Sequence, residues 1–540
     1  MRCACQSARS IASSSILCRP PLGCGRRPPR CARSISLVAT IETSRHPLHG
    51  GLALEPARPA AALPWSDGPI PSVLVLPLES PSGVRATPCV AVGDKVKRGQ
   101  CIARPPGPWD AAIHASSSGE VIAIEPHLVA LRNVAARACM LIRTDGEDRS
   151  EAPMSRCDPA TENRAAVLRR LAESGVVGLG GAVFSTAAKL SCASATPIGT
   201  LIVNAAECEP HIRCDEGLLA HCPADIAQGI HALSTFLGQP EVLIGLKETL
   251  DSTPLAGALD AAGLNAVRII RVPARYTAGA EEVLIRLLTG REIPRGALPT
   301  EVGCLCLNIA TVAAAGKALL EGTPVISRII TASGPGLARS ANLSARIGTP
   351  VSAILAACGG TTDTAGSLIL GGPMMGVALP NDAIPITKGS QALWVPTQQP
   401  FEESAPVQPC IRCGACASVC PMNLLPQQLY WHARTMDQNA LEAHALDACI
   451  ECGCCDVVCP SRIPLVETFQ TAKFQLTRAT SLDQRAAWLK ERIEARESRL
   501  EDRRAQQVTQ SGTRGEDPRE RLARLRAHRA RKDATPNQEP

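Results

Sequence analysis

Aromatic residues are scarce in this 540-residue sequence, which contains five Trp, two Tyr and five Phe. Proteins that bind single-stranded nucleic acid stack the bases on aromatic side chains, so this scarcity argues against that function. The 56 Lys and Arg residues barely outnumber the 50 Asp and Glu residues, and so small an excess gives no electrostatic reason to expect nucleic acid. We predict no nucleic-acid partner.

The sequence also lacks a long hydrophobic run. Gly, Pro or a charged residue interrupts every apolar stretch within about a dozen positions, whereas a membrane-spanning helix needs about 20 apolar residues in succession. We therefore predict no transmembrane segment. The apolar content of 45% is ordinary, and the length predicts three or four globular domains at about 100–200 residues per domain.

The first 41 residues lack acidic residues but contain seven Arg and five Cys. This composition is typical of an organellar transit peptide, and it also fits a secretory leader without a proper apolar segment. A third interpretation is a start assigned too far upstream in a bacterial gene; the next Met is Met140, so a true start nearby needs another initiation codon. We predict that residues 1–45 are leader-like or mis-assigned, are disordered and take no part in the fold.

Two cysteine runs indicate iron–sulfur clusters. Both have the form C-x₂-C-x₂-C-x₃-C-P, from Cys410 to Pro421 and from Cys449 to Pro460. In this pattern three thiolates of a run bind one [4Fe–4S] cluster and the fourth binds the other cluster. The predicted ligands are Cys410, Cys413, Cys416 and Cys459 for cluster 1, and Cys420, Cys449, Cys452 and Cys455 for cluster 2.

The cysteine runs also allow other interpretations. Paired C-x-x-C motifs form structural zinc sites as well, but zinc does not need two complete four-Cys runs ending in Pro. Cys454 is a ninth cysteine within the second run and is an alternative ligand to Cys455, although the register of the repeat favours Cys455. Tight C-x-x-C runs in a large chain indicate metal in a reducing compartment rather than disulfides.

The rest of the chain predicts a multidomain α+β protein. Residues 46–150 alternate β-like runs with turns, in an order typical of the barrel-sandwich hybrid of biotinyl and lipoyl carriers; where a carrier has a modifiable Lys, this sequence has His114–Gly119, so a structural domain is predicted. Residues 155–325 alternate helical and β-branched segments, which predicts an α/β domain. The remaining segments are a small β-grasp module (326–395), a mainly helical dicluster ferredoxin domain (400–475) and a charged helical or disordered tail (476–540).

A glycine-rich stretch in the α/β domain suggests a cofactor site. Successive glycines let backbone N–H groups approach a phosphate, although tight packing also explains such clusters. A lysine follows at a spacing that suits a phosphate or flavin oxygen, and polar residues follow the next predicted strand, where ligands of α/β proteins usually bind. The candidate cofactor-binding residues are Gly178, Gly180, Gly181, Lys189, Asn204, Glu207 and Glu209.

The order of these segments closely resembles the C subunit of the Rnf electron-transport complex. The resemblance runs from about His46 to Lys473 and is most specific in the two cysteine runs, in "NAAECEP" and in "GGPMMG". It implies that the α/β domain is similar to the flavin-bearing, NADH-oxidising subunit of respiratory complex I. Within "YTAGAEE" it adds Glu281 to the candidate cofactor-binding residues.

The function that this resemblance implies is that of an NADH-linked oxidoreductase and translocase subunit, active as part of a complex. Electrons would pass from NADH through FMN and two [4Fe–4S] clusters to membrane-embedded Rnf-type subunits that are coupled to ion translocation. FMN is needed because hydride carries two electrons and each cluster carries one. Such a subunit is peripheral, on the cytoplasmic side of a bacterial inner membrane, with a ferredoxin or a redox regulator as a further electron partner.

The glycine loop departs from the family pattern. The family usually has Gly-Ala-Gly-Phe-Pro-Thr where this chain has Val183 and Ser185 at the third and fifth positions, and Tyr-Pro-x-Gly-Gly-Glu where it has Ala280 at the fifth. A β-branched residue does not readily adopt a positive φ, so Val183 is expected to avoid that conformation and to crowd a close ligand. The alternative function is a non-catalytic iron–sulfur relay or scaffold that has lost flavin and NADH binding.

Overall fold

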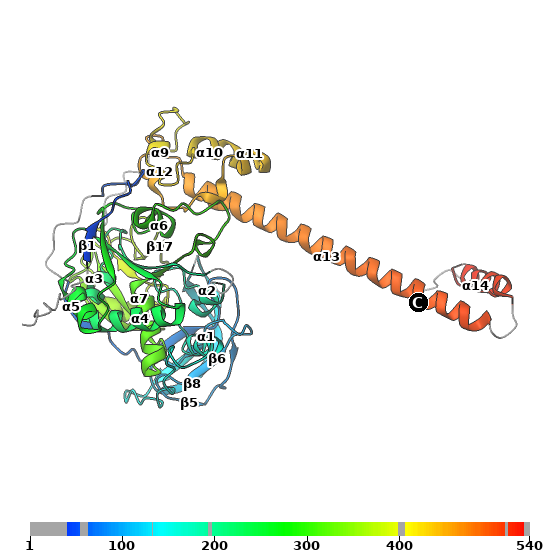
Figure 1. Cartoon of the computed structure of the whole chain (residues 1–540), viewed down its shortest axis with the longest axis horizontal. Coiled ribbons are helices and arrows are strands. Elements are labelled where there is room, and N and C mark those ends of the chain that lie inside the picture. The colour runs from blue at the N-terminus through cyan, green and yellow to red at the C-terminus, as the bar shows by residue number, and fades with distance from the viewer. Residues whose placement is uncertain are drawn as a thin grey trace, which may run out of the picture. The chain divides into compact units, whose positions relative to one another are not determined.

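The computed structural model (Figure 1) describes residues 40–54, 63–131, 133–192, 197–397, 406–512 and 517–533. Within these residues the strands form four sheets, of five, six, four and three strands. The mixture of sheets and helices confirms the predicted α+β class. Most of the predicted leader, residues 1–39, lies outside the described residues.

The first β domain consists of two small antiparallel sheets. Its longest pair is β8 (Gly119–Ala130) and β9 (Val134–Thr144), and β3 (Val73–Pro77) pairs with the other edge of β9. The sheets are completed by β4 (Thr87–Pro88), β5 (Lys95–Val96), β6 (Cys101–Arg104) and β7 (Ile113–His114). The segment 114–118, which stands where a carrier would present its lysine, is buried in this domain. A buried segment fits the predicted structural role.

The α/β domain is built on a parallel sheet in the order β1-β12-β11-β10-β13. Its strands are β1 (Thr40–Thr43), β10 (Thr200–Ala205), β11 (Glu241–Lys247), β12 (Arg268–Val272) and β13 (Cys304–Asn308). Its helices are α1 (Arg164–Glu173), α2 (Thr186–Cys192), α3 (Cys214–His221), α4 (Pro223–Leu237), α5 (Thr253–Ala261), α6 (Glu281–Thr289) and α7 (Ile309–Gly316). Parallel strands bring their carboxyl ends to one edge of the sheet, and the site residues lie there.

Strand β1 corrects one prediction. Residues 1–45 were expected to take no part in the fold, but Thr40–Thr43 pairs in parallel with Arg268–Arg271 of β12. The Glu42 carboxylate accepts two hydrogen bonds from the Arg268 guanidinium, at 3.0 and 2.9 Å. Composition alone missed this strand because a parallel edge strand is specified by a partner more than 220 positions away in the sequence.

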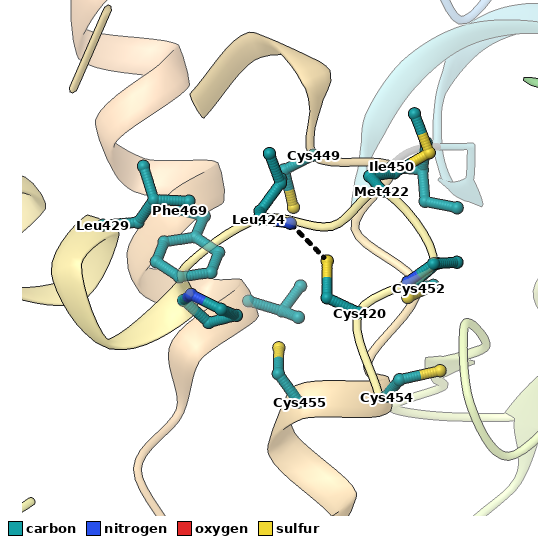
Figure 2. Close-up of a pocket in the computed structure, with 13 residues that line it drawn as sticks. Cys420, Met422, Leu424, Leu429, Cys449, Ile450, Cys452, Cys454, Cys455 and Phe469 are labelled. Carbon is teal, nitrogen blue, oxygen red and sulfur yellow. Dashed lines mark hydrogen bonds between the residues drawn. The ribbon is translucent and has the colours of Figure 1, made fainter. Parts of the chain in front are cut away.

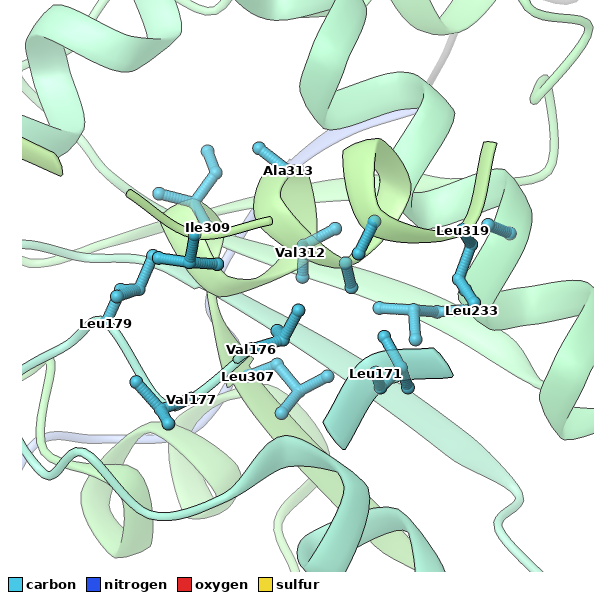
Figure 3. Packing of buried hydrophobic residues seen from close by; sticks show 14 of the residues in the cluster. Leu171, Val176, Val177, Leu179, Leu233, Leu307, Ile309, Val312, Ala313 and Leu319 are labelled. Atoms are coloured by element: carbon cyan, nitrogen blue, oxygen red, sulfur yellow. The ribbon is translucent and has the colours of Figure 1, made fainter. Parts of the chain in front are cut away.

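The core of the α/β domain explains why α4 and α7 are helical. In α4 the buried residues Ile226, Ile230 and Leu233 recur at helical spacing, and Gly238, in the left-handed conformation, ends the helix. Figure 3 shows Leu233 of α4, Val312 of α7 and Leu307 of β13 among the packed side chains of this core. These packed side chains hold the strands that carry the site residues in place.

The β-grasp module contains a six-stranded sheet in the order β17-β16-β18-β14-β15-β2. Its strands are β14 (Ser327–Ser333), β15 (Ala341–Arg346), β16 (Ile369–Leu370), β17 (Val377–Ala378) and β18 (Ala392–Trp394), with helix α8 (Val351–Ala357). The sixth strand, β2 (Trp65–Asp67), comes from the stretch assigned to the first β domain, and pairs in parallel with β15. Strand β2 thus connects the two predicted β regions.

The cysteine-rich segment is mainly helical, as predicted. Its helices are α9 (Ala415–Ser418), α10 (Pro426–Thr435), α11 (Gln438–Ala443) and α12 (Cys454–Val457). The charged segment then forms α13 (Leu465–Gly512) and α14 (Pro518–Asp533), whose described side chains beyond residue 477 are exposed. Among the described residues, no helix combines the length and the apolarity needed to cross a membrane.

Candidate iron–sulfur and flavin sites

Two hollows in the cysteine-rich segment are each lined by four predicted ligands. Thiol set 1 consists of Cys410, Cys413, Cys416 and Cys459. Thiol set 2 consists of Cys420, Cys449, Cys452 and Cys455, and Figure 2 shows its hollow. Each set combines three cysteines of one run with the last cysteine of the other, so the fold brings together the exchanged sets that the spacing predicts. Four thiols around one hollow fit the donor set of a [4Fe–4S] cluster.

Cys454 also borders the second hollow, but it is oriented differently. In Figure 2 the Cys455 sulfur points toward the space shared with Cys420 and Cys449, whereas the Cys454 sulfur points away from it. Both residues are in the short helix α12, where successive side chains point in different directions. This orientation favours Cys455 as the ligand.

Backbone N–H groups are directed at the exchanged cysteine of each set. The N–H of Leu424 donates to Cys420 Sγ at 3.4 Å, drawn as the dashed line in Figure 2, and the N–H of Ile463 donates to Cys459 Sγ at 3.5 Å. Hydrogen bonds to sulfur stabilise thiolate and tune the potential of a cluster. The two sites are thus equivalent halves of an internal repeat.

The glycine loop between α1 and α2 leaves donors available. Leu179 N donates to Thr311 Oγ1 at 2.8 Å and Gly178 N to Phe184 O at 2.8 Å, which fixes the base of the loop. Within the part of the chain that the structure describes, the N–H groups of the exposed residues Gly180, Gly181 and Ala182 have no acceptor. Three neighbouring free donors suit a phosphate, but Gly178, also named from the sequence, is not among them because its N–H is already used.

Val183 overturns the expectation that it would avoid a positive φ. It adopts φ +53°, and its N–H donates to Gly178 O at 3.0 Å. The Val183 Cγ2 atom lies close to the position that a Cβ atom at Gly389 would occupy. The valine therefore packs on the β-grasp module. Strain in the backbone is offset by this packing. Ser185, the second departure, donates from Oγ to the carbonyl of Trp109 in the first β domain.

Lys189 and Glu281, separated by 92 positions, form an ion pair. Lys189 Nζ lies 2.7 Å from Glu281 Oε1 and donates to the Cys306 carbonyl at 2.8 Å. Nearby, Asn204 at the end of β10 donates to the Gly279 carbonyl at 2.8 Å. The carboxyl ends of β10 and β13 therefore gather these candidates at one edge of the sheet.

Glu207 belongs to a buried polar cluster that the sequence did not reveal. Its Oε1 accepts from Cys214 Sγ at 3.0 Å and from Asp215 N at 3.2 Å, and Asp215 Oδ2 accepts from Asn308 Nδ2 at 2.7 Å. Burial raises the pKa of both carboxyl groups, and Arg328 of the β-grasp module opposes this through its charge on Asp215. Asn308 lies against Gly180, so the cluster adjoins the glycine loop. Its strand-end position was the one available signal for Asn308.

The raised pKa values predict a pH dependence of stability. A carboxyl whose pKa is higher in the folded state binds more protons folded than unfolded, so stability falls as the pH rises above the ordinary carboxyl pKa of about 4. We expect Asp215→Asn to gain stability relative to the wild type by more than about 1 kcal/mol between pH 5 and pH 8. Urea unfolding of the anaerobic protein measures this change.

The matched control for that experiment is Asp251→Asn. Hydrogen bonds from Thr253 lower the pKa of Asp251. Its contribution to the free energy of unfolding is therefore complete above pH 5. We expect the difference in free energy of unfolding between Asp251→Asn and the wild type to be constant from pH 5 to pH 8. A constant difference for Asp215→Asn as well would contradict the buried-carboxyl interpretation.

Glu209 contacts the β-grasp module. Its Oε1 accepts from Met374 N at 2.7 Å and Met375 N at 3.2 Å, in the "GGPMMG" segment. Tyr276, whose Oη donates to the Cys452 carbonyl at 2.6 Å, packs in the same buried group. These contacts place the loop after β10 against thiol set 2. The sequence pointed to the "NAAECEP" and "GGPMMG" segments but did not show that they contact each other.

Comparison with known families assigns the parts of the chain. Residues 46–147 match the RnfC barrel sandwich hybrid domain, residues 171–317 the Nuo51 FMN-binding domain, residues 329–378 the SLBB domain and residues 406–463 the 4Fe-4S dicluster domain. The C subunit of the ion-translocating oxidoreductase complex of Pseudomonas aeruginosa is 42% identical over 465 residues, which are 85% of this chain. The predicted resemblance to the C subunit of the Rnf complex is confirmed.

The chain spans about three fifths of the length of these RnfC relatives. It covers 60% of the Pseudomonas aeruginosa protein, and 58% of the corresponding Klebsiella pneumoniae protein, which is 40% identical over 81% of this chain. Among solved structures, an NAD⁺-reducing [NiFe]-hydrogenase is 20% identical with a TM-score of 0.40, covering 54% of this chain and 58% of its own. That similarity is too low to carry an inference.

The residues at the sheet edge fit FMN, the cofactor of the matching domain family. The free N–H groups of the glycine loop suit its phosphate, whereas Lys189, Asn204 and Asn308 offer side-chain hydrogen-bond donors. When bound, FMN supplies the exchange between two-electron and one-electron chemistry. Asn308 therefore joins the candidates named from the sequence.

Proposed function

We propose that this chain is the peripheral electron-input subunit of a membrane-bound, ion-translocating Rnf-type complex. NADH would be oxidised at the FMN site, and electrons would leave one at a time through two [4Fe–4S] clusters to membrane-embedded partners. The proposed ligands are thiol sets 1 and 2. The proposed location is the cytoplasmic side of a bacterial inner membrane, with a ferredoxin or a redox regulator as a further electron partner.

The observation that carries this proposal is the junction between the α/β domain and thiol set 2. The Tyr276 hydroxyl bonds to the Cys452 carbonyl, and Glu209 holds the Met374 loop, whose carbonyl lies against Gly453. Electron transfer needs donor and acceptor close together and held rigidly. The junction supports an order in which electrons reach set 2 first and set 1 second.

The test is an anaerobic titration of the purified, cluster-loaded chain with NADH, with and without added FMN. We expect NADH to bleach the visible absorption of both clusters when FMN is bound and to leave it unchanged when FMN is absent, because hydride cannot pass directly to a one-electron centre. We also expect the purified protein to contain stoichiometric FMN, so this flavin is first removed for the arm without FMN.

A non-catalytic relay or scaffold is the competing function, and the departures at Val183, Ser185 and Ala280 favour it. It predicts full cluster content, no bound FMN and no bleaching by NADH under any condition. Dithionite, which reduces clusters directly, is the control that shows them to be redox-active in either case.

A further inference from the structure

The two thiol sets are equivalent in backbone but not in charge. Arg412 and Glu451, the third residues of the two runs, both adopt φ +57°, and Asn423 and Arg462, which follow the closing Pro of each run, adopt +54° and +51°. Because the last cysteine of each run is exchanged, Arg412 and Arg462 both flank set 1, whereas Glu451 and Asn423 flank set 2. These four positions thus give set 1 two positive charges and set 2 one negative charge, which is paired with Lys473.

The two sites also differ in their access to solvent. Set 2 contains the buried residues Cys452 and Cys455, and Tyr276 bonds to the Cys452 carbonyl. In set 1, Cys413 is exposed and its neighbour Ile411 is 68% exposed, although Ile411 is a large apolar residue. Ile411 thus places a large apolar side chain at the surface beside an exposed ligand.

The arginines around set 1 differ from Glu451 in their ion pairing. Among the described residues, Arg412, Arg434 and Arg462 form no ion pair, whereas Glu451 beside set 2 is paired with Lys473 Nζ at 2.7 Å. Arg434 lies over the rings of Tyr430, which lines the first hollow, and of Trp431, 5.7 and 5.6 Å from their centroids. Set 1 is therefore bordered by exposed arginine, tryptophan and aliphatic groups, the residue types enriched at interfaces.

We propose that Ile411, Arg412, Trp431, Arg434 and Arg462 form the docking surface for an acidic redox protein that takes electrons from the cluster of set 1. The proposal rests on the proposed function for the supply of electrons and adds where they leave and what charge the acceptor carries. One electron passes from the reduced cluster to the oxidised metal centre of the partner, and no bond or proton is exchanged. Unpaired arginines raise the rate of encounter with an acidic partner.

The test uses two acceptors of opposite charge and high potential, an acidic blue-copper plastocyanin and a basic cytochrome c. The cluster-loaded chain is reduced with dithionite, freed of excess reductant and mixed with each acceptor in a stopped-flow instrument. We expect plastocyanin to react at least about 10-fold faster at low ionic strength than at high, because attraction between exposed charges is screened by salt. Cytochrome c is expected to react more slowly at low ionic strength than at high.

The variant that tests the surface is Arg412→Gln with Arg462→Gln. We expect it to keep the iron and sulfide of the wild type, to lose about 10-fold in rate with plastocyanin at low salt and to gain with cytochrome c. Arg85→Gln, at an exposed arginine of the first β domain, is the matched control and is expected to change neither rate. Equal salt dependence with the two acceptors, or equal rates for variant and wild type, would overturn the proposal.

This experiment is independent of NADH and flavin because dithionite reduces the clusters directly. A chain that fails the NADH titration but discriminates between the two acceptors would refute the proposed input and support the docking surface. A chain that passes the titration but does not discriminate would do the reverse.

Discussion

Cys420→Ser is expected to remove the cluster of thiol set 2 and to leave that of set 1, although Cys420 belongs to the first run. The physical reason is the exchange of the fourth ligand, which places Cys420 in one hollow with Cys449, Cys452 and Cys455. Iron and labile sulfide should fall from about eight to about four per chain. Electron paramagnetic resonance of the dithionite-reduced protein should lose the signal of one cluster and any coupling between the two.

Two further variants sharpen this test. Cys459→Ser is the mirror case and should remove the cluster of set 1 alone. Cys454→Ala is the matched control, because Cys454 is a buried neighbour of Cys455 whose sulfur points out of the hollow; it should retain about eight iron per chain. Loss confined to set 1 in Cys420→Ser, or loss of set 2 in Cys454→Ala, would refute the assigned ligands.

Gly279→Ala is expected to destabilise the flavin site severely. A Cβ at this position would lie 2.0 Å from the Ala206 carbonyl oxygen and 3.2 Å from Cys208 Sγ. Neither the "NAAECEP" loop nor the Gly279 carbonyl, which accepts from Asn204, can keep its place. Overpacking of this kind costs up to about 3 kcal/mol in free energy of unfolding. We expect loss of bound FMN and of reduction by NADH, with dithionite reduction of the clusters preserved.

Gly257→Ala is the matched control for Gly279→Ala. Gly257 is exposed in α5, and a Cβ there would meet no atom within 4 Å. Alanine is the better helix former, so the free energy of unfolding should rise by about 0.5–1 kcal/mol, with FMN content unchanged. Urea unfolding and flavin absorbance measure both variants. Retention of FMN by Gly279→Ala would show that the close approach of these two loops is unimportant.

Local patterns predicted most of the elements but not their long-range partners. The alternation of helical and β-branched segments in residues 155–325 was sufficient to predict an α/β domain, because helices and strands bury their apolar residues at different spacings. Strand β1 was not predicted because its pairing with β12 cannot be recognised from amino-acid composition. Val183 was misjudged because its positive φ is compensated by packing on Gly389, a residue of another domain.

The candidate flavin site divides in the same way. Lys189, Asn204 and Glu207 were named from loop chemistry and strand ends, and the structure brings all three to one edge of the sheet. Glu209 was named with them but hydrogen-bonds to the "GGPMMG" segment of the β-grasp module. Asp215 and Arg328 were not predicted because it is their burial that shifts their pKa values and marks them as unusual. Burial is a property of the folded chain.

The sequence by itself determined the ligand chemistry, because the spacing of a C-x₂-C-x₂-C-x₃-C-P run limits which thiols reach one cluster. It also determined the kinds of domain, since hydrophobic periodicity is a local property. Only the tertiary structure decided which thiol set meets the α/β domain and which set is exposed beside Arg412 and Arg462. The two runs are nearly identical locally, so the difference between them comes from what the rest of the chain packs against, as the Tyr276 contact with Cys452 shows.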